Sequence, residues 1–454
     1  MVKVRFAPSP TGHLHIGNAK TALYNFLFAR SRGGVFTLRM EDTDIERSDA
    51  LYERSIMDDL AWLGISWDEG PYRQSERLDT YREHAKALLG KGLAYKCFCT
   101  EEELAAERQR SLAKGEPPRY NGKCRDLSED ETRRLKTDGR EFTLRFRADP
   151  RQITFHDGIR GELNFPRGHV EDFIILRTDG TPTYNLAVVV DDMLMGITDV
   201  IRGGDHISNT PKQISLFHAF GSPAPRYAHH SLLIGPDRKP LSKRHGATRV
   251  IDFRSMGIMR EALINYLGTM GRNTVREIMN MDELTRTFSL DSVSASDNVF
   301  DREKLLWFNK EYLKHMPIGK LIEETGLGPG EAPRISAVRE NASTINELRD
   351  YLGIFTKPEL DERAVNYLVK TPGASEIARS VRDILSGNKK VSFDDFTKSI
   401  GQPGNIRKKD IFMILRAFIT GRPDGPPLKD VFPLVPPEII TGRIEAYLNL
   451  HHER

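Results

Sequence analysis

The 454-residue sequence has only three cysteines, no low-complexity tract and no excess of either charge. Its 67 Lys and Arg residues nearly balance 64 Asp and Glu residues, so the formal net charge is only +3. This balance excludes a histone-like or wholly basic RNA-coating protein, and any nucleic-acid surface must therefore be local. With 39% hydrophobic and 29% charged residues, the composition is typical of a folded protein rather than a disordered one.

Long apolar segments are also missing from the sequence. No stretch reaches the roughly 18 to 20 uncharged apolar residues that cross a bilayer, and residues 1–8 lack the apolar run of a signal peptide. We therefore expect a cytoplasmic protein with no membrane partner. At about 150 residues per domain, the length predicts roughly three domains.

The three cysteines, Cys97, Cys99 and Cys124, are too few, odd in number and too close together for a disulfide framework. Their spacing suits a tetrahedral zinc site, but zinc takes four ligands and only three are thiols. Tyr120 and Asp126 are the two candidates for the fourth ligand. The alternative is three reduced, half-buried thiols without a metal.

The first 40 residues predict the opening of a parallel α/β sheet. Residues 2–7 alternate as a strand does, and Pro8 and Pro10 end it because proline lacks the backbone donor. Apolar residues at helical spacing predict a helix over 18–32, and strand formers follow over 35–40. A strand, a helix and a strand in this order open a Rossmann-like parallel-sheet domain.

We expect five regions along the chain: 1–96, 97–183, 184–250, 251–320 and 321–454. The first and third form the two halves of the Rossmann-like domain. The second combines the cysteines with strand-like segments and is expected to be an α+β insertion. The fourth follows a basic loop, and the fifth shows only helical patterns between Pro and Gly breakers, which predicts an all-α C-terminal region.

Some elements can be predicted within the later regions. The continuous apolar run 186–190, followed by Asp191 and Asp192, predicts that the sheet resumes with a buried parallel strand. A helix is expected over 211–220. In the last region, helices are expected at 344–352, 361–370, 374–385, 408–419 and 437–450.

Two loops carry the residue types of a nucleotide site. Residues 8–18 lie between the first strand and its helix, where backbone N–H groups and the helix dipole favour phosphate. There His15 and Gly17 add a donor and a close-approach position. The second loop, residues 237–246, is basic. Its Ser242 and Lys243 suit a developing pyrophosphate, although a solvated turn explains its composition equally well. The sequence contains no Walker motif, so this is not a P-loop.

Six segments resemble those of bacterial glutamyl-tRNA synthetases, which are class I aminoacyl-tRNA synthetases. They occur in the family's order over the first 320 residues: RFAPSPTGHLHIG from Arg5, EDTD from Glu41, PTYN from Pro182, DD from Asp191, VIRGGDH from Val200 and LSKRHG from Leu241. The helical C-terminal third also resembles the bacterial form. Glutaminyl-tRNA synthetases and the archaeal and eukaryotic glutamyl enzymes have β-barrels there instead.

The resemblance implies ATP-dependent attachment of L-glutamate to the 3' end of tRNA(Glu) through a glutamyl-adenylate. ATP with Mg²⁺ would be used, and some family members also hold one structural Zn²⁺ at the cysteines. In a monomer, the insertion would hold the acceptor end, region 251–320 the inner stem and region 321–454 the anticodon. Whether tRNA(Gln) is charged as well stays open.

The resemblance also implies roles for single residues. The expected catalytic residues are His15 and Lys243. The expected ATP-binding residues are Ser9, His15, Gly17, Asp205, Ser242 and Lys243. Because a γ-carboxylate pairs best with a guanidinium and an α-ammonium with a carboxylate, Arg5 and Glu41 are expected to hold the two ends of glutamate. The remaining residues expected in the glutamate pocket are Ser9, Tyr184 and Arg202.

Two positions depart from the family pattern. Asn18 replaces the final His of the HIGH motif, and Pro240 replaces the first lysine of the KMSKS motif, with Lys239 one place upstream. The second departure keeps open a catalytically silent RNA-binding paralogue. Two further alternatives are a small-molecule nucleotidyltransferase and the shorter relative that glutamylates queuosine in tRNA(Asp). The 134 residues from 321 to 454 count against both.

Overall fold

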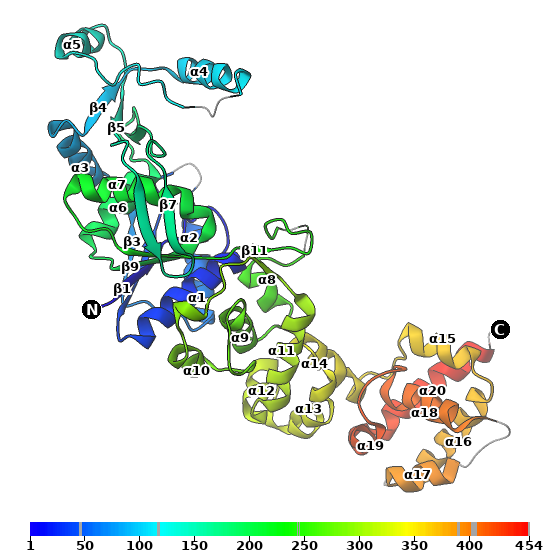
Figure 1. Ribbon diagram of the computed structural model, residues 1–454. Helices are drawn as coiled ribbons and strands as arrows, with labels where there is room; N and C mark the ends of the chain where they lie inside the picture. Colours follow the sequence, from blue (N-terminus) through cyan, green and yellow to red (C-terminus); the bar gives the residue numbers. More distant parts are fainter. Residues whose placement is uncertain are drawn as a thin grey trace. The chain divides into compact units, whose positions relative to one another are not determined.

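The computed structural model describes residues 1–44, 48–115, 119–242, 244, 246–387, 391–400 and 406–452. The chain forms two compact units (Figure 1). The N-terminal unit comprises residues 1–252 and 264–300, and the C-terminal unit comprises residues 253–263 and 301–454. In the described part of the chain, no helix has both the length and the apolar composition needed to cross a bilayer.

A parallel sheet in the N-terminal unit confirms the predicted order of strand, helix and strand. Its strands pair in the order β1-β2-β3, and α1 connects the first two. Gly33 follows this helix with φ 57°, a left-handed conformation that glycine adopts without strain. The elements are β1 (Lys3–Phe6), α1 (Ile16–Ser31), β2 (Val35–Met40), α2 (Ala50–Trp62) and β3 (Glu69–Arg73).

A second sheet adjoins the first one at β1. The backbone N–H of Thr198 donates to the carbonyl of Lys3 at 2.9 Å, which places the start of β9 beside β1. Strands β9, β10 and β6 run parallel, and β7 completes the order β7-β6-β10-β9. Two of these strands, β6 and β7, come from the segment expected as an insertion. The elements are β6 (Ile153–Asp157), β7 (Gly161–Phe165), β9 (Asp199–Gly203), α7 (Thr210–Phe220) and β10 (Arg226–His230).

The strand predicted over 186–190 is wrong. These residues belong to helix α6 (Tyr184–Leu194), and all side chains from Leu186 to Val190 are at most 1% exposed. A short apolar run that is buried on every side fits a helix as well as a strand, so its pattern does not separate the two. The sheet resumes at β9 instead, and Asp191 and Asp192 lie on the helix.

A separate antiparallel sheet, in the order β4-β5-β8, carries the cysteine region. Lys96 stands opposite Leu144, and Leu144 stands opposite Leu176. Because neighbouring side chains in a strand point to opposite faces, this row faces α3, whereas Cys97 belongs to the other face. The elements are α3 (Leu78–Gly90), β4 (Ala94–Cys97), α4 (Glu101–Ala113), α5 (Glu129–Thr137), β5 (Thr143–Phe146) and β8 (Phe173–Leu176).

The basic loop, residues 237–246, follows a short strand. This strand, β11, pairs in parallel with β12, which follows much later in the chain. After the loop, the N–H of Ile16 donates to the carbonyl of Thr248 at 2.8 Å, so the segment that follows the loop is tied to the start of α1. The elements are β11 (Leu233–Ile234), α8 (Val250–Ser255), α9 (Arg260–Thr269), α10 (Met281–Arg286) and β12 (Asn298–Val299).

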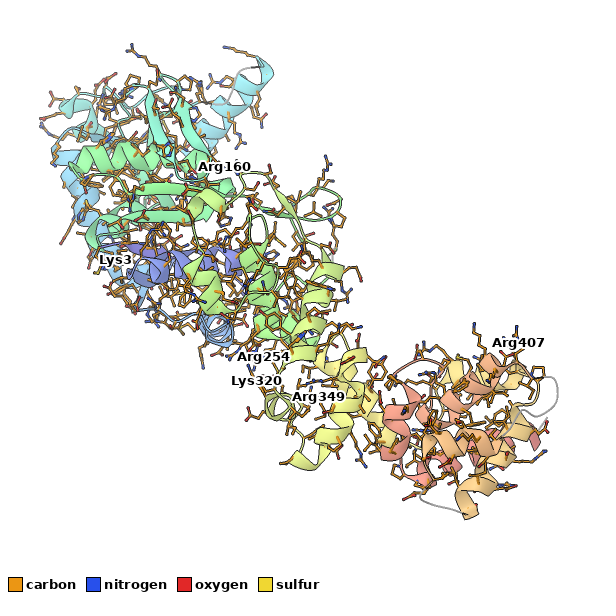
Figure 2. All side chains as sticks on the ribbon, turned by 60° about the horizontal axis from the view of Figure 1, so that its bottom comes forward. Lys3, Arg160, Arg254, Lys320, Arg349 and Arg407 are labelled. Carbon is orange, nitrogen blue, oxygen red and sulfur yellow. The ribbon has the colours of Figure 1, made fainter. Side chains whose placement is uncertain are left out.

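The C-terminal unit contains no strand among its described residues, as expected for an all-α region. The five helices predicted there are present, and α12, α13, α17 and α19 were not predicted. Side chains close some helix ends: Arg349, labelled in Figure 2, donates to the carbonyls of Glu324 and Thr325 at the end of α12. The elements are α11 (Arg302–His315), α12 (Ile318–Thr325), α13 (Ala332–Val338), α14 (Ile345–Leu352), α15 (Glu362–Lys370), α16 (Ala374–Gly387), α17 (Phe393–Ile400), α18 (Lys408–Thr420), α19 (Leu428–Val431) and α20 (Pro437–His452).

We expect replacement of Arg443 by Met to destabilise the C-terminal unit. Arg443 is 1% exposed. Its guanidinium donates to the backbone carbonyls of Ile354, Lys357, Phe418 and Ile419. Because Met leaves these carbonyls without their donor, the free energy of unfolding should fall by about 3 kcal/mol. Urea unfolding followed by circular dichroism measures this loss, with Arg379→Met at an exposed helical position as the control. Equal stability of the two variants would contradict the prediction.

Candidate active site

A cavity of about 670 Å³ lies where β1, β2 and β9 end, beside the N-terminus of α1. Parallel sheets bind ligands at this edge because loops and helix N-termini converge there. Eight of the residues predicted for ATP or glutamate line it: Arg5, Ser9, His15, Gly17, Glu41, Tyr184, Arg202 and Asp205. Ser242 is not among the described lining residues, although its neighbour Leu241 is, and Lys243 lies outside the described residues.

Arg5 reaches this cavity from β1 and is 4% exposed. Its Nε donates to both carboxylate oxygens of Asp192, at 3.2 and 3.3 Å. Both hydrogen bonds that Arg5 forms with described residues use Nε. The two terminal nitrogens therefore stay available for an acceptor in the cavity, such as a carboxylate.

Behind Arg5 lies a buried charge network that the sequence reasoning missed. Arg39, fully buried on β2, donates to Asp192 at 2.7 Å and to Glu41 at 3.4 Å, and its Nε lies 3.6 Å from Asp191. Asp191 also accepts hydrogen bonds from Gln74, Arg77 and Tyr81. The signal in the sequence is a lone arginine in the otherwise uncharged strand VFTLRM.

This network sets the charge state of the two carboxylates nearest the cavity. Burial alone would raise the pKa of Asp192, but Arg5 and Arg39 outweigh it and lower that pKa below its ordinary value. At Glu41 the effect of burial is larger than the opposing effects of Arg39 and Arg5, so the pKa of Glu41 is raised. Asp192 therefore serves as a fixed anion, and Glu41 is a carboxyl that an incoming cation would help to ionise.

Arg202 provides a second donor that faces the same cavity and is 5% exposed. Its Nε lies 3.1 Å from His229 Nε2, and its Nη2 donates to the Thr210 hydroxyl at 2.8 Å. Its Nη1 is buried and has no hydrogen-bond partner in the described part of the chain. Buried donors without an acceptor are rare in folded proteins, so this atom marks a place for a ligand oxygen.

His15 caps the N-terminus of α1. Its Nδ1 accepts a hydrogen bond from the N–H of Gly17 at 3.2 Å, so the neutral ring carries its proton on Nε2. Burial lowers the pKa of His15, and a backbone hydrogen bond at Leu241 opposes this only in part. His15 is therefore a neutral hydrogen-bonding group at pH 7, beside the positive end of a helix dipole.

Tyr184 and His206 form a further pair at the cavity wall. The Tyr184 hydroxyl lies 3.1 Å from His206 Nδ1. Burial, aided by Arg202, lowers the pKa of His206 to about 4, so that this ring is also neutral at pH 7. His206 was not among the predicted site residues, although it directly follows Asp205.

Lys20 is another lining residue that the sequence reasoning missed. It lies on α1, is fully buried, and its Nζ has no hydrogen-bond partner among the described residues. Burial lowers the pKa of Lys20 to about 8, and the charge of Asp297 opposes this shift. The only signal in the sequence is a lysine within the apolar spacing that predicted this helix.

The cysteines form a compact cluster on the far face of the β4-β5-β8 sheet. Their three sulfur atoms lie within 4.8 Å of one another. The Tyr120 hydroxyl is 3.4 Å from Cys97 Sγ and 3.8 Å from Cys99 Sγ. Asp126 instead pairs with Arg147 at 3.0 Å, and its side chain is 84% exposed. Three thiols and a phenol at such distances fit a tetrahedral zinc ion, with Tyr120 rather than Asp126 in the fourth position.

Known protein families account for nearly the whole chain. Residues 1–307 match the family described as "tRNA synthetases class I (E and Q), catalytic domain", and residues 299–448 match the family described as "Anticodon binding domain". The first match covers the parallel-sheet part of the chain, and the second covers most of the C-terminal helices. The second also agrees with the all-helical structure of the C-terminal unit.

Individual relatives narrow this assignment. The glutamate–tRNA ligase of Carboxydothermus hydrogenoformans is 42% identical over 99% of this chain and 100% of its own length. Glutamate–tRNA ligase 2 of Syntrophus aciditrophicus is also 42% identical, over 99% of this chain and 98% of its own. The crystal structure of a glutamate tRNA ligase from Elizabethkingia meningosepticum in complex with its amino acid has a TM-score of 0.84 and 30% identity, with 99% of each chain covered. This chain thus belongs to the glutamate–tRNA ligase family of class I aminoacyl-tRNA synthetases.

Proposed function

We propose that this protein attaches L-glutamate to the 3' end of tRNA(Glu) in two steps. ATP first activates the glutamate α-carboxylate as glutamyl-adenylate, with release of pyrophosphate. A hydroxyl of the terminal tRNA ribose then takes the acyl group. The observation that carries the proposal is one cavity that brings together two buried guanidinium groups, a carboxyl group and the N-terminus of α1.

Glutamate fits the donors and acceptors of this cavity. The terminal nitrogens of Arg5 would pair with the γ-carboxylate, and the Nη1 of Arg202 offers a further donor to a substrate oxygen. Glu41 would hold the α-ammonium, whose charge favours the ionised form of this carboxyl. Ser9 and Tyr184 would complete the pocket. Glutamine is expected to be rejected because its neutral amide leaves a buried guanidinium without an anion.

ATP would lie across the start of α1. Its phosphates would meet the helix N-terminus, the His15 ring and the backbone at Gly17, and Asp205 would bind the ribose. Ser242 and Lys243, from the second loop, would stabilise the departing pyrophosphate. Mg²⁺ bound to ATP would neutralise part of the phosphate charge. Since glutamate itself is the nucleophile, the protein contributes positioning and charge stabilisation.

The alternatives fit the chain less well. The shorter relative that acts on queuosine has no anticodon-binding part, whereas this chain has a helical C-terminal unit and matches that family over 299–448. A silent paralogue would have no need for the orphaned donor of Arg202 beside Arg5 and Glu41. Activity with glutamate and tRNA distinguishes these cases.

The partner assignments extend this proposal to the rest of the molecule. Region 97–183 would hold the acceptor end, 251–320 the inner stem and 321–454 the anticodon, whose unpaired bases are read by stacking and edge hydrogen bonds. We infer a cytoplasmic monomer. Charging purified tRNA(Glu) and tRNA(Gln) side by side decides whether the second tRNA is also a substrate.

The main test is glutamate charging by an Arg5→Ala variant. The wild-type chain should charge tRNA(Glu) with glutamate and not with glutamine. In the variant, kcat/KM for glutamate should fall by roughly 100-fold or more, because the buried anion of the substrate loses its partner. Arg32→Ala, an exposed arginine at the end of α1, is the control. Charging that survives in Arg5→Ala would refute the assignment of this cavity to glutamate.

A second prediction concerns pH and Lys20. If its ammonium donates to ATP, kcat/KM for ATP should be flat below pH 8 and decline above it, because the ammonium of the free enzyme loses its proton near pH 8. Lys20→Arg should remove this decline, since a guanidinium stays charged. ATP–pyrophosphate exchange with glutamate and tRNA present provides the measurement. An identical pH profile in wild type and Lys20→Arg would exclude Lys20 from this role.

A third prediction concerns zinc at the cysteine cluster. A zinc ion bound by four side chains would link β4 to the segment that precedes α5. The purified protein should contain about one zinc per chain, because the four donors suit a closed structural site. Elemental analysis should show most of it lost in Cys99→Ser and retained in Asp126→Ala. Loss of zinc in Asp126→Ala with retention in Tyr120→Phe would reverse the choice of fourth ligand.

A further inference from the structure

Arg202 differs from the other buried arginines of the candidate active site in the kind of partner that it has. Arg5 and Arg39 both pair with the carboxylate of Asp192. Among the described residues, Arg202 instead donates to a histidine ring and a threonine hydroxyl. Neither of these groups is an anion, so the charge of Arg202 is not neutralised by its own hydrogen bonds and is left for a ligand.

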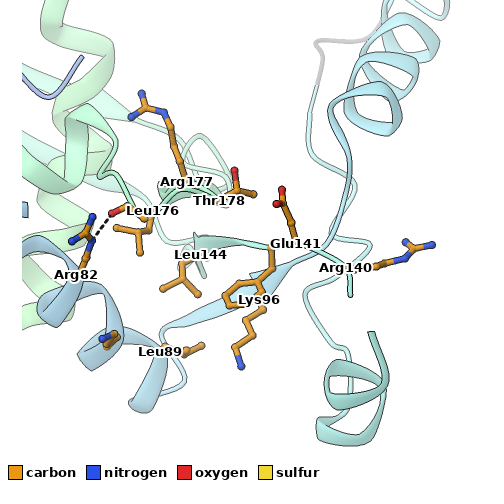
Figure 3. Close-up of a pocket in the computed structure, with 12 residues that line it drawn as sticks. Arg82, Leu89, Lys96, Arg140, Glu141, Leu144, Leu176, Arg177 and Thr178 are labelled. Atoms are coloured by element: carbon orange, nitrogen blue, oxygen red, sulfur yellow. Dashed lines mark hydrogen bonds between the residues drawn. The ribbon is translucent and has the colours of Figure 1, made fainter. Parts of the chain in front are cut away.

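Another cavity, of about 470 Å³ between α3 and the β4-β5-β8 sheet, offers no comparable donor (Figure 3). None of its described lining residues has a buried polar atom without a hydrogen-bond partner. Arg82 in its wall donates to the carbonyl of Gly180 at 3.0 Å, as the dashed line in Figure 3 shows. What holds Arg202 in place therefore matters for the candidate active site in particular.

The ring of His229 is the acceptor for Arg202 Nε. His229 lies on β10 and is fully buried. Its Nδ1 lies 2.5 Å from Asp157 Oδ2, and its Nε2 lies 3.1 Å from Arg202 Nε. The Nε of arginine always carries a proton, so His229 Nε2 must accept and the ring proton must lie on Nδ1. The Thr210 hydroxyl is also 3.1 Å from Nε2, but it can donate or accept, so Arg202 determines the tautomer.

Asp157 is held as an anion at the end of β6. Its carboxylate accepts hydrogen bonds from the backbone N–H groups of Ile159, Arg160 and His229, at 3.0, 3.0 and 3.2 Å. Burial would raise the pKa of Asp157, but the His229 ring and the N–H groups of Ile159 and Arg160 outweigh it and lower that pKa. An ionised carboxylate accepts and cannot donate, so it faces the protonated nitrogen of the ring.

The ring of His229 is neutral at pH 7. Burial lowers the pKa of His229, and the hydrogen bond to Asp157 opposes this effect only in part. The charge of Arg202 lowers it further. An imidazolium would donate from both nitrogens and would repel the guanidinium, so only the neutral ring with its proton on Nδ1 can hold Arg202.

Thr210 fixes the guanidinium at a second point. The Nη2 of Arg202 donates to the Thr210 hydroxyl at 2.8 Å, and this hydroxyl lies 3.3 Å from the carbonyl of His206. Because a guanidinium is planar, anchoring Nε and Nη2 also fixes the direction of Nη1. This Nη1 is the buried atom that has no partner in the described part of the chain, on a side chain that lines the active-site cavity.

We propose that Asp157 and His229 are positioning residues of the glutamate pocket. Asp157 keeps the ring proton of His229 on Nδ1, and Nε2 then holds Arg202 so that its Nη1 can donate to a substrate oxygen. This inference rests on the proposed function, because it takes glutamate as the occupant of the cavity. Neither Asp157 nor His229 is among the described residues that line the cavity, so both act through Arg202. Through β6, the segment expected as an insertion thus contributes to the amino-acid site as well.

Replacement of Asp157 by Asn tests the tautomer with little change in shape. The amide oxygen can still accept from the backbone, but the amide NH₂ faces Nδ1 of His229 and moves the ring proton to Nε2, where it opposes Arg202. In ATP–pyrophosphate exchange with tRNA present, KM for glutamate should rise about tenfold or more and KM for ATP should stay within about twofold. Asp199→Asn, at a buried carboxylate of β9 that pairs with Arg226, is the matched control. Equal KM values for glutamate in the two variants would overturn the proposal.

A double-mutant cycle separates positioning through Arg202 from a general loss of structure. Since Arg202→Ala removes the group that is positioned, adding Asp157→Asn to it should change kcat/KM for glutamate by less than about twofold. The same loss from Asp157→Asn in both backgrounds would show a structural role and overturn the proposal.

Two replacements of His229 test its role as an acceptor. His229→Gln keeps a carbonyl oxygen near the position of Nε2 and should keep KM for glutamate within about threefold of the wild-type value, whereas His229→Leu should raise it about tenfold or more. Equal KM values in these two variants would refute the acceptor role.

Failure of the proposed function gives a different result from failure of this inference. A wild-type chain that does not activate glutamate would refute the proposed function. The NMR shifts of the His229 ring nitrogens, assigned by their absence in His229→Gln, still report the tautomer in that case. A proton on Nδ1 in the wild type and on Nε2 in Asp157→Asn supports the arrangement, and the same tautomer in both refutes it.

Discussion

The candidate active site depends on one buried guanidinium, that of Arg39. It lies on β2 and pairs with Asp191, Asp192 and Glu41, so that it joins the first sheet to helix α6. A buried ion that loses a partner costs several kcal/mol, which makes every member of this network sensitive to the position of the others. Since Asp192 also holds Arg5, both groups proposed for glutamate are positioned through the same arginine.

The charges of this network match those of the proposed substrate. Three guanidinium groups, of Arg5, Arg39 and Arg77, face the three carboxylates of Glu41, Asp191 and Asp192. Arg202 adds one more cation, whose Nη1 has no partner among the described residues. With Glu41 ionised, as the ammonium of the substrate would favour, this set carries one excess positive charge, and glutamate carries one net negative charge at pH 7. The expected preference for glutamate over the neutral glutamine depends on this balance as much as on any single contact.

The sequence predicts those parts of the site that depend only on the order of neighbouring strands and helices. Strand, helix and strand at residues 3–40 were predicted, and this order alone places Arg5, His15 and Glu41 at one edge of the sheet. The network was not predictable, because the apolar run 186–190 fits a buried strand as well as a helix. On a helix, Asp191 and Asp192 are about 100° apart, so that one carboxylate reaches α3 and the other reaches β1 and β2. On a strand they would point to opposite faces.

Lys20 was missed for a related reason: its role depends on what surrounds it rather than on its neighbours in sequence. Lys20 is relevant to Pro240, which stands where the KMSKS motif of the family has its first lysine. Pro240 pairs with Ile234 and lines the cavity without adding charge. The buried ammonium of Lys20 on α1 provides a cation in the lining of the same cavity. Because electrostatic stabilisation depends on where charge lies and not on which loop carries it, the loss of one lysine from the basic loop is compatible with activity.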